Sequence, residues 1–227
     1  MNSEKVIDAL EYACAEDSRP SLSKPFRDGR YMVASNGKLI FRHLVAEGES
    51  GYPEEFEGHP KTPKCFPEGE EWDKAASFTL DEVKKFLCFK ARYGEHLVNG
   101  VKRNPEDLDE YQCPCCRERL YMRDRELVDA DKDDESYDNR FGFDLVPPSG
   151  EKVIALGYIL NKFVRTILAF VDGDESRLAK VEMRLVDRGQ HVVAARGEGF
   201  EGVMIVYPRD RYDRYRTLET MKIGAAR

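Results

Sequence analysis

Apolar residues recur at helical spacing in two well-separated segments of the chain. In the first segment, residues 3–15, the apolar positions are Val6, Ile7, Leu10 and Cys14. In the second, GYILNKFVRTILAF, they are Leu160, Phe163, Val164, Ile167 and Leu168. Steps of three and four residues place such side chains on one side of a helix. We therefore expect two amphipathic helices, the first of them capped by Ser3.

Strand-like patterns follow each of these two segments. After the first, residues 31–34 and 38–41 flank Ser35-Asn36-Gly37, and an Asn-Gly pair is typical of hairpin turns because both residues tolerate a positive φ. After the second, the stretches KVEMRLVD, HVVAAR and FEGVMIVYP follow in turn. In KVEMRLVD, apolar and charged residues alternate, which predicts a half-buried strand.

The order of a helix followed by antiparallel strands thus occurs twice, at residues 3–45 and 158–207. One such unit cannot bury its apolar sides alone, whereas two units packed side by side can. We predict an α+β fold built from repeated modules of one helix and antiparallel strands, with the helices on one side of the sheet.

The chain between these two units has a different composition. Residues 46–77 combine prolines, glycines and acidic residues, and we expect an irregular connector there. A capping box of Thr79 and Glu82 then predicts the start of a helix that ends near Gly94. Residues 99–139 are polar and charged, as in an insertion or long loop. We divide the chain into an N-terminal half-module with connector (1–60), a helix-containing segment (61–98), an insertion (99–139), a C-terminal module (140–210) and a tail (211–227).

Composition narrows the class of protein. The chain has 227 residues, 35% of them charged, and a net charge of −7, so no global basic field attracts it to nucleic acid or membrane. The first residues do not resemble a signal peptide, and the longest apolar runs are too short to span a bilayer. Six cysteines are too few for a disulfide scaffold. We expect a soluble, cytoplasmic protein.

Motifs for catalysis are absent from the sequence. It contains no phosphate-binding loop, no dinucleotide-binding glycine motif, no H-E-x-x-H and no G-x-S-x-G. The four histidines are scattered, and nothing pairs a nucleophile with a base. We predict that the protein is not an enzyme.

Four short stretches occur in an order that is informative about the family. The first helix is followed by Asp17-Ser18-Arg19, and the hairpin contains Ala34-Ser35-Asn36-Gly37-Lys38-Leu39. GYPEEFEGHP comes next, and the last strand ends in Tyr207-Pro208-Arg209. This order resembles the bacterial replicative sliding clamp, the beta subunit of DNA polymerase III. That family carries Asp-x-Arg, a hairpin with Ala-Thr-Asp-Gly-His-Arg-Leu, a Tyr-Pro-Asp-Phe connector and a final Met-Pro-x-Arg. The resemblance covers roughly residues 3–60 and 150–210, and the insertion has no counterpart.

The resemblance implies a non-enzymatic DNA sliding-clamp-like protein, of the kind expected from a bacteriophage genome. It would contact or encircle duplex DNA, tether a polymerase or another replication factor, and could do so as a homo-oligomer. In sliding clamps, helices line the central hole and basic side chains face the phosphates. The candidate DNA-binding residues here are Lys84, Lys85, Lys90, Arg92, Lys162 and Arg165. The alternative for each is an ordinary solvated helix side.

A second function from another class stays open. The same fold could serve as a phage-type inhibitor or binding protein that acts on a host protein complex, because a fold does not fix a function. The net acidity and the acidic run DADKDDES would suit competition for a basic partner.

The cysteines of QCPCCRERL are candidate metal ligands. Cys113 and Cys116 form a C-P-x-C turn that can aim two thiolates at one zinc ion. A structural zinc site needs four ligands, and the available completions are His59, Cys65, Cys88, His96 and Cys115. The alternative is a solvated loop with incidental thiols. Zinc bound by Cys113 and Cys116 predicts stoichiometric metal in elemental analysis and its release in Cys113→Ser.

Overall fold

The computed structural model describes residues 2–15, 20–53, 62–77, 109–112, 119–122, 141–172, 174–212 and 216–223. Its helices are α1 (Ser3–Glu11), α2 (Glu70–Asp73), α6 (Gly157–Val171) and α7 (Glu175–Leu178), with 3-10 turns η1 (Pro20–Leu22), η2 (Pro63–Cys65) and η5 (Arg209–Tyr212). The strands up to the insertion are β1 (Phe26–Asp28), β2 (Tyr31–Ser35), β3 (Leu39–Leu44), β4 (Ala76–Ser77), β5 (Asp109–Gln112) and β6 (Arg119–Met122). The later strands are β7 (Phe141–Val146), β8 (Val153–Leu156), β9 (Glu182–Asp187), β10 (His191–Gly197), β11 (Phe200–Ile205), β12 (Tyr207–Pro208) and β13 (Arg216–Lys222).

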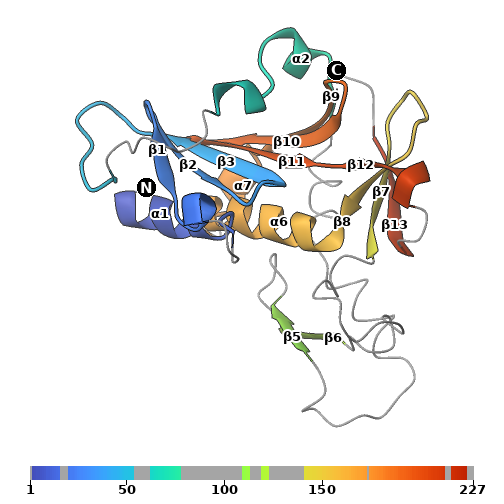
Figure 1. Ribbon diagram of the computed structural model, residues 1–227, viewed down its shortest axis with the longest axis horizontal. Helices are drawn as coiled ribbons and strands as arrows, with labels where there is room; N and C mark the ends of the chain where they lie inside the picture. The colour runs from blue at the N-terminus through green and yellow to red at the C-terminus, as the bar shows by residue number, and fades with distance from the viewer. Residues whose placement is uncertain are drawn as a thin grey trace.

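A seven-stranded sheet dominates the molecule, in the order β1-β2-β3-β11-β10-β9-β4 (Figure 1). A four-stranded sheet, β12-β8-β7-β13, continues from it through the short step between β11 and β12. All pairings in these two sheets are antiparallel except β13 with β7, which is parallel. Strands β5 and β6 form a separate antiparallel pair within the polar segment 99–139, which was predicted as an insertion or loop.

The seven-stranded sheet confirms the predicted repeat. Each half consists of one helix and a meander of three strands, α1-β1-β2-β3 and α6-β9-β10-β11. The last strands of the two meanders, β3 and β11, pair antiparallel at the middle of the sheet. The strand order therefore reads the same from either side of that pairing until the extra edge strand β4.

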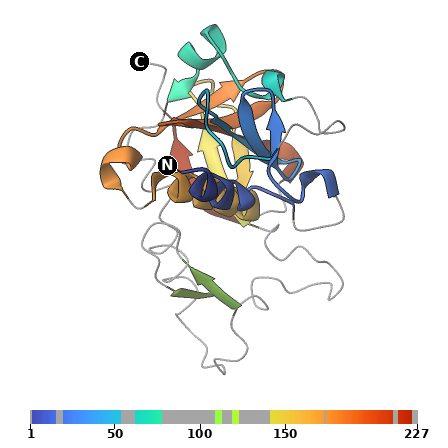
Figure 2. The ribbon, with the colours of Figure 1, turned by 90° about the vertical axis from the view of Figure 1, so that its left-hand side faces the viewer.

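Both helices of the repeat cover the same side of the seven-stranded sheet, as predicted (Figures 1 and 2). They run antiparallel, because Lys5 near the start of α1 is 2.7 Å from Asp172 just after α6, whereas Tyr12 after α1 lies against Arg165 in the middle of α6. The α+β class is thus confirmed, with the helices on one side of a largely antiparallel sheet.

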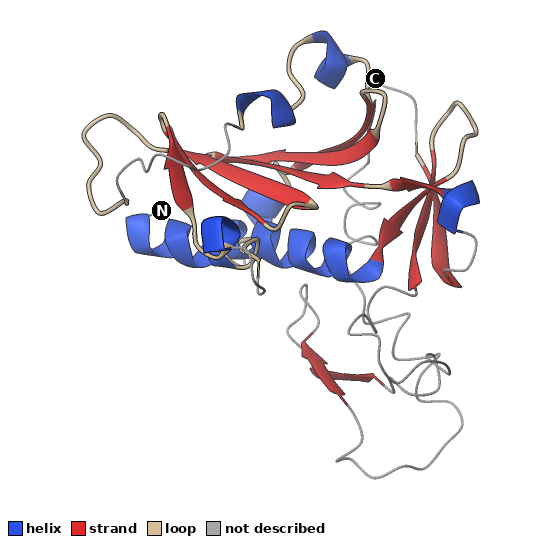
Figure 3. Ribbon diagram, in the orientation of Figure 1, coloured by secondary structure: helices blue, strands red, loops and turns tan. Residues whose placement is uncertain are grey.

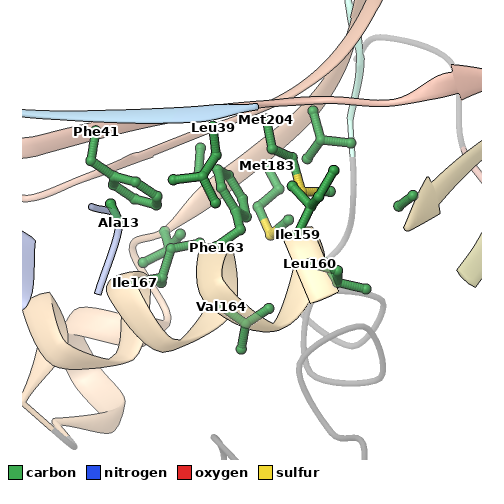
Figure 4. Packing of buried hydrophobic residues seen from close by; sticks show 14 of the residues in the cluster. Ala13, Leu39, Phe41, Ile159, Leu160, Phe163, Val164, Ile167, Met183 and Met204 are labelled. Carbon is green, nitrogen blue, oxygen red and sulfur yellow. The ribbon is translucent and has the colours of Figure 1, made fainter. Parts of the chain in front are cut away.

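The main core lies between this helix pair and the sheet (Figure 4). From α6, the predicted apolar positions 160, 163, 164 and 167 are all fully buried. At the central pairing, Phe41 on β3 faces Gly202 on β11. A Cβ on Gly202 would lie 2.6 Å from Phe41 Cζ, so the glycine leaves the space that the ring fills. The ring also packs against that of Phe163 in a tilted arrangement, with centroids 5.0 Å apart.

Two local predictions about turns were wrong in detail. The cap of α1 is Asn2 rather than Ser3: its side chain accepts a hydrogen bond of 3.0 Å from the amide of Lys5. In the hairpin turn only Gly37 has a positive φ, of 84°. Asn36 contributes through its side chain, which accepts from the amides of Lys38 and Leu39 and so holds the turn without a left-handed backbone.

The connector 46–77 was predicted to be irregular, and the structure corrects this for residues 62–77. They contain η2, α2 and β4, and they lie over the side of the sheet opposite the helices (Figure 3). Strand β4 pairs with β9 and so becomes an edge of the sheet. The expected tail, 211–227, likewise contains a strand, β13.

Candidate nucleic-acid interface

The six candidate DNA-binding residues fall into two groups. Lys84, Lys85, Lys90 and Arg92 lie outside the described residues. Lys162 and Arg165 lie one turn apart on α6, on the side of that helix next to α1. The structure therefore places one pair of the predicted residues on the helix layer.

Both of these cations contact the end of α1. The Arg165 guanidinium lies 4.8 Å from the centroid of the Tyr12 ring, and Arg165 is exposed. Lys162 is half-buried and donates to the carbonyl oxygen of Cys14, with Nζ 3.4 Å away. These contacts hold the two helices together and keep the two positive charges at the junction between them.

Tyr12 is a surface residue that the sequence pattern did not single out. It is 42% exposed, and it is one of two large apolar side chains with that degree of exposure among the described residues. An exposed aromatic ring next to an arginine can stack on a sugar or a base, or lie against a protein partner. The only signal in the sequence was its position just outside the apolar stripe of the first helix.

The remaining outward side of α1 is acidic. Glu4, Asp8 and Glu11 are exposed there, together with Lys5. Lys5 forms an ion pair with Asp172, and both side chains remain more than half exposed. The helix layer is therefore electrostatically mixed, with positive charge at the Lys162–Arg165 end and negative charge along α1.

Neither described cysteine of the core region has the features of a reactive site. Burial, together with the smaller effect of the Glu11 charge, raises the pKa of the Cys14 thiol to about 12. Burial also raises the pKa of Cys65, although that side chain is exposed in part. Low thiol pKa values mark nucleophilic cysteines, and both of these shifts are in the opposite direction.

The predicted zinc ligands Cys113 and Cys116 lie outside the described residues, as do His59, Cys88, His96 and Cys115. Strands β5 and β6 flank the cysteine segment, and Gln112 pairs with Arg119. In the part of the chain that the structure describes, no group of three His, Cys, Asp or Glu side chains could hold a metal ion. The zinc site stays a prediction.

Compared with known proteins, this chain has matches among solved structures but not among protein families or curated sequences. The chain matches no protein-family model and no curated protein. Among crystal structures it is similar to the DNA polymerase III beta subunit of Thermotoga maritima, with a TM-score of 0.43 and 15% sequence identity over 92% of this chain and 64% of that one. The DNA polymerase III beta chain of Streptococcus pneumoniae has a TM-score of 0.40 and 10% sequence identity, over 91% of this chain and 64% of that one. A DNA polymerase sliding clamp from Pseudomonas aeruginosa has a TM-score of 0.38 and 12% sequence identity, over 91% of this chain and 63% of that one.

These structures belong to the family that the sequence motifs resemble. This chain spans less than two thirds of the length of each of them. Among the described helices, none is long and apolar enough to cross a membrane.

Proposed function

We propose that this protein is a non-enzymatic, sliding-clamp-like DNA-binding protein, of bacteriophage type, whose α1–α6 layer contacts duplex DNA. In this proposal the layer tethers the protein to the duplex while another surface holds a polymerase or a second replication factor. The contact would be to phosphates and independent of base sequence. Assembly of several copies around the duplex is part of the same proposal.

The observation that carries this proposal is the pairing of the two helices on one side of a sheet built from two equivalent halves. The arrangement places the two helices next to each other, and Arg165 is exposed on this layer next to Tyr12. Lys162 adds a second positive charge one turn away. The order of motifs in the sequence, which resembles that of bacterial clamps, supports the same function independently of the charges.

The acidic side of α1 favours a second candidate function. Glu4, Asp8 and Glu11 are all exposed on the same layer, and like charge repels phosphates. A protein that used this surface to bind a basic patch on a host complex would need no DNA affinity. This is the inhibitor alternative, and it predicts a monomer or small dimer that ignores DNA.

A salt titration of DNA binding separates these two functions. The full chain is titrated with a labelled duplex at several salt concentrations, in the wild type, in Lys162→Gln/Arg165→Gln, and in Lys74→Gln. Each phosphate contact that is lost should reduce the slope of log K against log salt by about 0.9. The double variant should therefore bind more weakly and with a flatter slope. Lys74 lies just after α2, on the opposite side of the sheet, and its side chain is 75% exposed, so Lys74→Gln should match the wild type.

Binding should be measured on closed circular duplex as well as on linear duplex, because a protein ring can slide off the free ends of linear DNA. Greater retention on circular than on linear DNA, together with a discrete oligomer in solution, is expected of an encircling clamp. Absence of affinity for both forms at low salt, in a protein that is monomeric, would overturn the DNA-binding proposal and leave the inhibitor alternative.

A further inference from the structure

The side of the seven-stranded sheet that faces away from the helices is covered by the chain's own residues 62–77, which we call the strap. At one end, the amide and hydroxyl of Thr62 donate to the Asp28 carboxylate on β1, at 2.8 and 2.7 Å. At the other end, β4 pairs with β9. The strap thus crosses from one edge of the sheet to the other, as the segment containing α2 shows in Figure 1.

Four arginines of the sheet hold the strap, and we call the surface that they form the arginine face: Arg42 on β3, Arg184 on β9, Arg188 after β9 and Arg196 on β10. Arg42 lies between two rings, 4.5 Å from the centroid of Tyr31 and 4.1 Å from that of Phe66. It also pairs with Glu201 of the sheet and, at 3.4 Å, with Glu68 of the strap.

The other three arginines bind the second half of the strap. The guanidinium of Arg196 lies 4.0 Å from the centroid of the Trp72 ring and donates to the Pro67 carbonyl at 2.6 Å. Arg184 lies 4.8 Å from the same ring and donates to the Trp72 carbonyl at 2.6 Å. Arg188 pairs with a Glu71 carboxylate oxygen at 3.2 Å. Every arginine of this surface therefore contacts the strap through a ring, a carbonyl or a carboxylate.

A small apolar cluster, separate from the main core, lies beneath these contacts. Its buried members are Phe66, Trp72, Ala75, Val186, Ala194 and Val203. Phe66 and Trp72 are only 3% and 5% exposed, so two aromatic anchors of the strap fill the space between the arginines. Buried aromatic anchors surrounded by charged residues are the usual composition of a protein-recognition surface.

The strap has the composition of a ligand for such a surface. It carries four acidic residues and two lysines besides its two aromatic anchors. Its own local structure is weak, because α2 has only four residues and its N-cap, Gly69, has a φ of 50° and supplies no side-chain cap. The contacts with the arginines, rather than helix formation, therefore determine where the strap lies.

We infer that the arginine face is a recognition surface for acidic peptide segments that carry aromatic residues, with the strap as its intramolecular occupant. The partner is a protein segment of the same chemistry as the strap: a Phe or Trp among glutamates and aspartates. Such a segment binds by displacing the strap, and the pairing of arginine with carboxylate and aromatic ring provides its specificity. This surface lies on the opposite side of the sheet from the helix layer, so its occupation does not depend on the DNA proposal.

The chain offers a direct probe of displacement, because Trp72 is its single tryptophan. A synthetic peptide of residues 62–77 with Trp72→Phe has no tryptophan, so all emission comes from the protein. Titration of the wild-type chain with this peptide should shift Trp72 emission to longer wavelength in a saturable manner, as the ring leaves its buried site. A control peptide of equal charge, with Phe66→Ser and Trp72→Ser, should leave the emission unchanged.

A variant with a weakened strap sharpens the test. The chain with Phe66→Ala/Trp72→Ala should bind a labelled strap peptide at least about tenfold more tightly than the wild type, because its own segment competes less. Arg184→Gln/Arg196→Gln in the same background should abolish that binding. A weakened-strap variant that keeps the far-UV circular dichroism of the wild type but does not bind the peptide would overturn the inference.

Two further outcomes also decide the matter. If the weakened-strap variant does not fold, the wild-type titration decides alone, and no shift at millimolar peptide overturns the inference. If the wild type forms a dimer in which straps are exchanged and the peptide does not compete, the occupant is a second copy and the proposed partner class is wrong.

Discussion

The two sides of the seven-stranded sheet are covered in different ways by the same strands. Toward the helices, Met183, Ala195 and Phe41 pack into one large apolar core. On the other side, their strand neighbours Arg184 and Arg196 hold the strap through rings, carbonyls and carboxylates. Because successive side chains on a strand point to opposite sides, one set of strands can support both kinds of packing. The comparison suggests a permanent contact on one side and an exchangeable contact on the other.

The physical difference between these contacts is their response to salt. Apolar burial hardly depends on dilute salt, whereas the attraction between solvent-exposed charges weakens as salt is added, with a screening length of about 8–10 Å at physiological ionic strength. Variants on each side of the sheet should therefore differ in the size of their effect and in its salt dependence.

The largest effect is expected from Phe163→Ala in the helix-side core. Phe163 is fully buried on α6 and packs against Phe41. Loss of the ring should lower the free energy of unfolding by about 3–5 kcal/mol, by the same amount at low and moderate salt. Chemical denaturation followed by circular dichroism measures this value. An unchanged denaturation midpoint would refute the assignment of this side as the main core.

Arg42→Ala should have the next largest effect, on the strap side. The Arg42 side chain is 7% exposed and is held by two rings and two glutamates. Its loss should lower the free energy of unfolding by about 1.5–3 kcal/mol. The loss is no larger because Glu201 keeps its 2.8 Å pair with Arg196. The part of this cost that comes from the pair with Glu68, which is 69% exposed, should shrink as salt is raised, unlike the cost of Phe163→Ala. Equal salt dependence in the two variants would contradict the distinction between the two sides.

Gly202→Ala tests the central pairing of the two halves. The new methyl group would meet the Phe41 ring, and overpacking of this kind costs about 1–3 kcal/mol. Phe41→Leu should relieve the clash, so the double variant should be more stable than the sum of the two single changes predicts. Strictly additive effects in the double-mutant cycle would show that the ring does not occupy the space above Gly202.

His43 should make stability depend on pH. Burial lowers its pKa below the usual 6.5, although the negative charge of Glu49 opposes this shift. A lowered folded-state pKa means that folding favours the neutral imidazole. This contribution is full above the unfolded pKa and is lost as pH falls below about 6.5 toward the folded-state value. Denaturation curves between pH 7.5 and 5 should show this loss in the wild type, and His43→Gln should reduce it. The same pH slope in both proteins would exclude His43 as its source.

The smallest effect is expected from Lys5→Ala at the helix pair. Its ion pair with Asp172 has an N–O distance of 2.7 Å, but the two side chains are 57% and 53% exposed. Exposed pairs contribute about 0.2–1 kcal/mol, and salt screens them. Thermal denaturation at low and high salt should show a small difference that disappears at high salt. A larger cost would mean that this pair fixes the packing of α1 against α6.

The parts of the fold that could be predicted from the sequence are those with a regular apolar pattern. The stripe through Leu160, Phe163 and Ile167 indicated both the helix α6 and its buried side, because helical spacing directly encodes which side is covered. The repeat could be inferred for a similar reason, since an unpartnered apolar side needs a second unit.

The strap could not be predicted, because its signals are those of a solvent-exposed surface. Strands β9 and β10 contain one arginine each, Arg184 and Arg196, and a charged residue on a strand is typical of a solvated strand side. Phe66 and Trp72 have no periodic spacing. The contacts between these arginines and the strap form only once strands that are far apart in the sequence have paired. Strand β13, RTLETMK, is similarly mixed in character, and its parallel pairing with β7 depends on the path of the whole chain.

The candidate site was predicted in part. The sequence identified Lys162 and Arg165 as cations off the apolar stripe, but it could not indicate that both contact the end of α1. That contact depends on the antiparallel packing of two helices about 150 residues apart.

Hydroxyl-radical footprinting tests the central claim, that the helix layer meets DNA, most directly. Tyr12 and Leu44 are exposed to a similar degree, 42% and 40%. Tyr12 lies at the helix pair that is proposed to contact DNA, whereas Leu44 lies at the end of β3. Saturating duplex DNA should reduce the oxidation of Tyr12, measured by mass spectrometry. The oxidation of Leu44, the control residue, should stay unchanged. Oxidation of Tyr12 that stays the same at saturating DNA would contradict the account.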